Sequence, residues 1–167
     1  MVNINFLVTA LAALIPLIVG AIWYNPKVFG SVWLKSTGLS EEELKKANMA
    51  KVFGLTYVFS LLIAIILNPI VIHQFGFQSM LMGEADLLTE GSEANLFFTT
   101  TLEKYGTAFR TFKHGMLHGT INGLLFATPV IGIVGLFERK GAKYILVHAG
   151  YWILTLGLMG GVIGQFP

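Results

Sequence analysis

The sequence predicts an all-α, polytopic membrane protein, an antiparallel bundle of four transmembrane helices. Of its 167 residues, 54% are hydrophobic and only 12% are charged, and the mean hydropathy is +0.71, which is too apolar for an ordinary soluble domain. Four apolar stretches without Lys, Arg, Asp or Glu can each cross about 30 Å of hydrocarbon at about 1.5 Å per residue. They cover residues 4–23, 52–72, 115–137 and 144–166 of a single membrane domain, residues 1–167.

Each apolar stretch is expected to be helical, because lipid offers no partner for an unpaired backbone group. Pro16, Pro69 and Pro129 are then kinks inside helices. The net charge of +2 gives no case for nucleic acid, and the absence of cysteine excludes thiolate metal sites.

The distribution of Lys and Arg predicts the orientation. Eight lie in the first connection and in the short turn of residues 138–143, whereas the middle connection, residues 74–113, has three. The positive-inside rule therefore places the first and third connections in the cytoplasm, and the middle connection and both termini outside.

The first connection carries an aromatic and glycine motif. Asn25 and Pro26 should stop the first helix, and Ser40 with Glu43 forms a capping box that predicts a short cytoplasmic helix from Ser40 to about Ala50. The motif is typical of an anchor at headgroup depth combined with a rigid turn. A docking surface for a cytoplasmic partner is the more specific alternative. Its residues are Gly20, Trp23, Tyr24, Pro26, Phe29, Gly30 and Trp33.

This motif, followed by GLSEEEL, resembles the opening of domain-of-unknown-function family 1761, small bacterial four-helix membrane proteins. LFERK at Leu136 to Lys140 and AGYWILTLGLMGGVIG from Ala149 to Gly164 resemble the closing hairpin of that family. The resemblance implies an architecture and a bacterial inner membrane, with no activity or catalytic residues to transfer.

The outward middle connection is too long for a simple turn. Apolar residues recur at helical spacing in its second half and predict an amphipathic helix, lying flat on the outer leaflet or folded over the helix ends as a lid. These residues are Phe98, Leu102, Tyr105, Phe109 and Phe112. Residues 83–95 before it are expected to be a solvated turn region.

The third apolar stretch opens with HGMLHGTING, which repeats a polar residue and a glycine every four positions. On a helix, His114, His118 and Asn122 form one polar stripe. Asn68 and His73, at the outer end of the second helix, should lie at a similar depth.

Three interpretations of this polar cluster stay open. The side chains could bond across helices for packing alone. They could hold zinc, copper or haem iron, with His114 and His118 as paired ligands and His73 or Glu103 completing the shell. They could also line a water-filled vestibule, although no polar stripe continues inward past Asn122.

Glycines predict close packing of the third and fourth helices. They form small-xxx-small patterns in the outer half of each helix, at Gly115, Gly119, Gly123, Gly157, Gly160, Gly161 and Gly164. The excess of glycine leaves room for a second copy or another membrane subunit. His148, near the cytoplasmic end, is expected to be an interfacial histidine bonded to Tyr151 or to a turn carbonyl.

The sequence contains no acid, base and nucleophile set that fixes a reaction. We therefore expect a non-enzymatic accessory or structural subunit that packs against other membrane proteins or itself, most simply without a cofactor. An outward histidine site for metal or haem is the main alternative, and a small-solute or ion permease is the second.

Overall fold

The computed structural model describes residues 1–166, apart from the side chain of Glu41, and is all-α over these residues. Four helices in this range are long and apolar enough to span a membrane, which confirms the coarse fold prediction. They run over Phe6–Trp23, Met49–Val71, Phe112–Phe137 and Ala142–Gln165. Pro167, the last residue of the predicted domain, lies outside the described residues.

The first span consists of α1 (Phe6–Ala12) and α2 (Ile15–Trp23), with Pro16 in the first turn of α2. The missing N–H of Pro16 costs no hydrogen bond there, because the first amides of a helix have no partner within that helix. The second span, α5 (Met49–Val71), continues through Pro69.

The third span consists of α8 (Phe112–Asn122), the π-helical segment η2 (Gly123–Ala127) and α9 (Thr128–Phe137). The π segment ends two residues before Pro129, which occupies the first turn of α9. A π segment accommodates a proline by shifting the hydrogen-bonding register. The fourth span is the continuous helix α10 (Ala142–Gln165).

Three short elements connect the first two spans: the π-helical η1 (Pro26–Gly30), α3 (Ser31–Thr37) and α4 (Glu41–Lys45). The predicted capping box is present, and the hydrogen bonds from Ser40 lower the pKa of Glu43. The predicted helix to Ala50 was too long, because Asn48 caps α5 and forces a break after Lys45.

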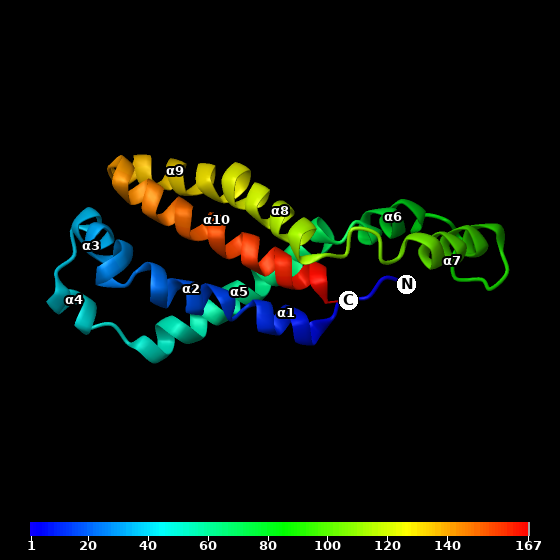
Figure 1. Ribbon diagram of the computed structural model, residues 1–167, viewed down its shortest axis with the longest axis horizontal. Coiled ribbons are helices and arrows are strands. Elements are labelled where there is room, and N and C mark those ends of the chain that lie inside the picture. The colour runs from blue at the N-terminus through cyan, green and yellow to red at the C-terminus, as the bar shows by residue number, and fades with distance from the viewer. Residues whose placement is uncertain (167) are drawn as a thin grey trace.

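The middle connection forms a hairpin of α6 (Gln74–Leu81) and α7 (Glu93–Tyr105). Figure 1 shows this hairpin projecting away from the spans along the long axis of the molecule, so it is not folded over the helix ends. The predicted helix over Phe98 to Phe112 was wrong in its bounds. The chain leaves the helix at Gly106, and Phe109 has a left-handed backbone with φ of 62°.

Helix α10 is the centre of the packing. In Figure 1 it lies between α8–α9 on one side and α1–α2 on the other, and it also contacts α5. Its side chains Met159 and Ile163 are almost fully buried. They pack with Ala64, Leu67 and Val71 of α5 and with Ala12 and Ala13 of the first span.

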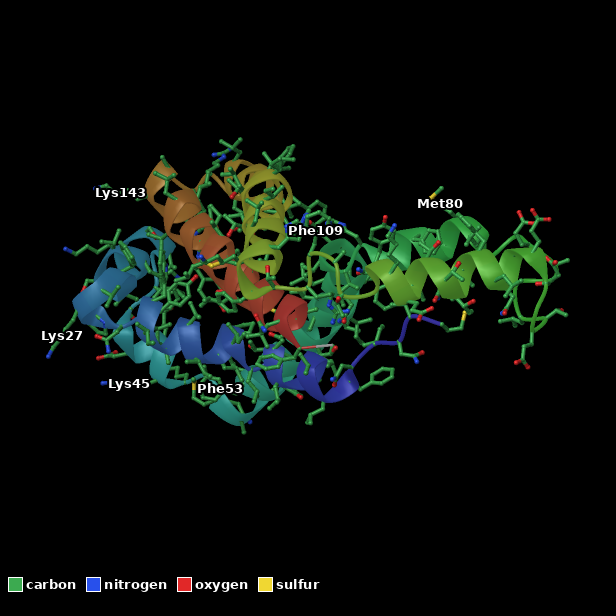
Figure 2. All side chains as sticks on the ribbon, turned by 45° about the vertical axis from the view of Figure 1, so that its right-hand side comes forward. Lys27, Lys45, Phe53, Met80, Phe109 and Lys143 are labelled. Atoms are coloured by element: carbon green, nitrogen blue, oxygen red, sulfur yellow. The ribbon has the colours of Figure 1, made fainter. Side chains whose placement is uncertain are left out.

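The two ends of the molecule differ. The elements α3 and α4 lie at one end, and the α6–α7 hairpin and both termini lie toward the other (Figure 1). Figure 2 shows Lys27, Lys45 and Lys143 at the α3–α4 end, far from Met80 on the hairpin. Phe109 lies where the hairpin joins the spans, next to the histidines of the candidate site.

Candidate metal centre

Three histidines converge where the hairpin leaves the spans. The Nε2 atom of His114 lies 2.8 Å from Nε2 of His73 and 3.1 Å from Nε2 of His118. One ring nitrogen from each histidine lies within 4.8 Å of the others. His73 is exposed and the other two are partly buried, so solvent reaches the cluster. The structure therefore brings all three predicted histidines together.

Hydrogen bonds between the rings account poorly for this arrangement of the three ring nitrogens. The ring nitrogen of a neutral histidine carries either one hydrogen or one lone pair. Nε2 of His114 faces two other nitrogens, so a single hydrogen cannot point at both, and a single lone pair cannot accept well from both. An ion placed between the rings could instead accept a lone pair from each nitrogen, which is the usual role of neutral imidazole.

Local structure fixes each histidine. His114 and His118 lie one turn apart on α8 and so share one helix face. The Thr111 hydroxyl caps α8 by accepting from the His114 amide, and the Phe112 amide donates to Oε1 of Gln165 on α10. His73 sits at the junction of α5 and α6, directly before the first residue of α6.

Phe109 covers part of the cluster. Its ring stacks on His114 with centroids 4.9 Å apart and meets His73 edge-on at 5.9 Å. The buried Gln74 side chain holds the preceding loop by donating to the carbonyl oxygens of Tyr105 and Ala108 at 2.9 and 3.0 Å. The Arg110 guanidinium donates to the carbonyl of Phe166, and burial lowers the pKa of Arg110.

The other residues proposed for the polar cluster do not join it. Asn68 is buried, and its amide donates to Thr9 Oγ1 of the first span at 3.1 Å and to the Ala64 carbonyl of its own helix at 2.9 Å. Asn122 donates to the carbonyl of His118 within its own helix. Glu103 is exposed on α7, outside the group of potential ligands found among the described residues. The prediction grouped these residues because they lie at a similar depth in the membrane, and depth does not determine which way a side chain faces.

The predicted glycines lie where α8 and the start of η2 touch α10. A Cβ on Gly119 would collide with the Leu156 carbonyl oxygen, and one on Gly115 with the Gly160 carbonyl oxygen. A Cβ on Gly123 would lie 2.5 Å from Cα of Ile153. On α10, added Cβ atoms would press on α8 from Gly157, Gly160, Gly161 and Gly164. The absence of side chains therefore lets the two backbones meet, which places the His114 and His118 face at a fixed distance from α10.

An apolar cleft of about 650 Å³ separates α5 from η2 and α9, with α10 at its base. Ile66 of α5 and Phe126 of η2 line it and are more than 60% exposed, so the cleft opens on the face that lipid would cover. Asn122 contributes an amide to its wall.

The aromatic motif of the first connection packs against the start of α10. Trp23 Nε1 donates to the Val147 carbonyl at 3.0 Å, and the Tyr24 hydroxyl lies 2.8 Å from Nδ1 of His148. The rest of the motif supports these two rings. Phe29 packs on Trp23, and Trp33 meets Tyr24 edge-on. Gly20 borders the Tyr151 ring. Gly30 ends the π-helical turn that begins at Pro26, and a Cβ on Gly30 would strike the Tyr24 carbonyl.

The hydrogen-bond partner expected for His148 was wrong. Tyr24 bonds to it, whereas the Tyr151 hydroxyl donates to the Pro16 carbonyl at 2.9 Å. Burial is the main cause that raises the pKa of Tyr24, and the nearby Tyr151 and Tyr144 raise it further. The pairing depends on the end of α2 packing against α10, which the spacing of residues along the sequence does not reveal.

Sequence reasoning also missed the supporting roles of Gln74 and Phe109. Phe109 was assigned to a helical stripe, yet it belongs to the loop that covers the histidines. Gly106 was the available signal, because glycine commonly ends a helix. No local pattern marked Gln74 as the residue that fixes this loop.

The comparisons with known proteins give one result. The family model described as "Protein of unknown function (DUF1761)" matches residues 7–164, which include all four spans except one residue at each end. No curated protein and no solved structure matches the chain. The match covers the aromatic motif, the glycines and the three histidines, and the chain belongs to the DUF1761 family of unknown function.

Proposed function

We propose that this protein is a multi-pass membrane protein that binds a divalent transition-metal ion through His73, His114 and His118. The observation that carries the proposal is the approach of two Nε2 atoms to within 2.8 and 3.1 Å of Nε2 of His114. Four zinc ligands at about 2.0–2.1 Å in a tetrahedron are about 3.3 Å apart, close to these separations. The third pair, His73 and His118, lies within 4.8 Å, so side-chain rotation that brings these two rings together lets all three share one ion.

The donor set suits zinc or copper best. Imidazole nitrogen is a common ligand for both ions. Haem fits less well, because two axial histidines bind on opposite sides of the iron and their nitrogens are then about 4 Å apart at metal–nitrogen distances of about 2 Å.

We further propose that the four spans form an antiparallel bundle in a bacterial inner membrane with both termini in the periplasm. The clustering of lysines at the α3–α4 end supports this orientation through the positive-inside rule. The hairpin and the histidines then face the periplasm, where the metal site takes its ion from the outer solution.

Zinc titration of metal-stripped protein in detergent tests the metal proposal. The wild type should bind one ion per chain, and His118→Ala should bind more than about 100-fold more weakly, a larger loss than that of a residue that only supports a ligand. His148→Gln is the matched control, because His148 lies near the start of α10 and bonds to Tyr24, whereas the three histidines lie near the end of α10. Equal affinity in the wild type and His118→Ala would contradict the proposal.

The apolar cleft favours a second candidate, a non-enzymatic accessory subunit. The lateral opening between α5 and α9 could receive a helix of another membrane protein or of a second copy. A photo-crosslinking residue at Ile66, inside the cleft, should yield a discrete protein adduct in native membranes, whereas one at the exposed Leu146 outside it should not. Crosslinks only to lipid from both positions would contradict this role.

A further inference from the structure

We infer that the tri-histidine site keeps one coordination position for an exchangeable small anion, either hydroxide derived from water or a small anion from solution. This inference rests on the metal-binding function proposed above. It specifies what completes the shell of the ion once His73, His114 and His118 have bound it.

The ligand count leaves a position open. Zinc and similar ions take at least four ligands, and sites with three protein ligands complete the shell with water or substrate. Among the described residues, the group that could hold an ion consists of the three histidines alone. Glu103, the carboxylate considered as a fourth ligand, is exposed on α7 outside this group.

The charge balance favours an anion in that position. Neutral imidazoles bring no negative charge, so a divalent ion held by three of them keeps its full charge of +2. Lys113 directly precedes His114, and Arg110 lies in the adjoining loop with its guanidinium on the Phe166 carbonyl. The local chain thus adds positive charge, and a metal-bound water loses a proton readily in such surroundings.

The histidine cluster is reached from solution and bordered by an apolar ring. His73 is exposed, so solution reaches the site from its side. On the other side the Phe109 ring stacks on His114 and borders His73. Because the site is open to solution on the His73 side, small anions such as hydroxide, halide or azide can exchange at the fourth position.

Cobalt substitution tests the inference in the full-length protein in detergent. Co²⁺ replaces zinc in such sites and reports its shell through visible absorption bands. With one Co²⁺ bound per chain, azide should change the spectrum and saturate at one azide per cobalt, and gel filtration should show that the cobalt stays bound. The same azide titration of free Co²⁺ in the detergent buffer supplies the background.

The outcomes separate the two proposals. If Co²⁺ binds stoichiometrically in the wild type and not in His118→Ala, but saturating azide leaves the spectrum unchanged, the open position is refuted while the metal site stands. If Co²⁺ and Zn²⁺ both fail to bind the wild type, the proposed function itself fails, and the anion position fails with it.

Discussion

The Nε2 atoms of His73 and His114 lie 2.8 Å apart, although 41 positions separate the two residues in the chain. The contact joins the C-terminal end of the second span to the start of the third, across the whole α6–α7 hairpin. His118 reaches the same point from one turn further along α8. Two spans and the base of the hairpin thus meet at one cluster of imidazole nitrogens.

Replacing the aromatic cover should speed the release of metal. In Phe109→Ala the ring that stacks on His114 is lost, so water reaches the ion from a second side. We expect the dissociation rate, measured by transfer of zinc to a chromogenic chelator, to rise about 10-fold or more, as hydrophobic surroundings control solvent access to metal sites. Phe97→Ala removes an exposed phenylalanine from the hairpin and is the control. Identical rates in all three proteins would show that Phe109 does not shield the ion.

Adding one methyl group to the α8–α10 contact should destabilise the protein. In Gly119→Ala the new Cβ meets the Leu156 carbonyl oxygen, so the helices must separate. Overpacking typically costs about 1–3 kcal/mol, and a collision with backbone should cost at least that much. Gly54→Ala on α5 is the control, because a Cβ there meets nothing within 4 Å. Unfolding in mixed micelles would measure both variants, and equal stability would argue against close packing of α8 on α10.

Removing the Tyr24 hydroxyl should affect stability in two ways. Tyr24→Phe loses the hydrogen bond to His148, which should cost about 0.5–1.5 kcal/mol near neutral pH. The raised pKa of Tyr24 keeps its hydroxyl protonated in the folded state, whereas in the unfolded chain it ionises near its ordinary value of about 10. Wild-type stability should therefore fall as the pH rises above about 10, and this part of the fall should vanish in Tyr24→Phe.

The exposed Tyr105 provides the comparison for that experiment, as Tyr105→Phe should keep the wild-type dependence on pH. Unfolding free energies are measured from neutral to alkaline pH. A fall of the same steepness in the wild type and Tyr24→Phe would show that Tyr24 does not titrate in the way its surroundings imply.

Single cysteines can test the orientation, because the natural chain contains none. A membrane-impermeant thiol reagent applied to the periplasmic side should label Glu90→Cys in the hairpin and leave Lys45→Cys in α4 unlabelled. Both positions are exposed, so access to the reagent depends on the side of the membrane. The reverse pattern would place the histidines in the cytoplasm and contradict the orientation.

The spans followed from the sequence because apolar runs of this length have few alternatives in lipid. The second and third spans begin three residues earlier than predicted, because a polar cap lies before the apolar run, at Asn48 and at Thr111. The helix predicted over Phe98 to Phe112 is present up to Tyr105 and was extended too far, because an apolar period of four and three continues through Gly106 even though the backbone leaves the helix there.

The candidate site was only partly predictable. The spacing of His114 and His118 indicated a shared face, since four residues make about one helical turn. The direction in which Asn68 points depends on the position of Thr9 in another helix, and helical depth alone cannot supply it. The loop that places Phe109 over the rings depends on Gln74 reaching two carbonyls more than 30 positions away, a contact that appears only in three dimensions.

The most direct test of the tri-histidine site is X-ray absorption spectroscopy at the zinc edge on protein loaded with one zinc per chain. Three shared histidines predict imidazole scattering from three nitrogen ligands at about 2.0–2.1 Å, with one further light atom completing the shell. In His73→Ala the imidazole contribution should drop or the zinc should be lost. A shell of oxygen ligands with one imidazole or none in the wild-type protein would contradict the site.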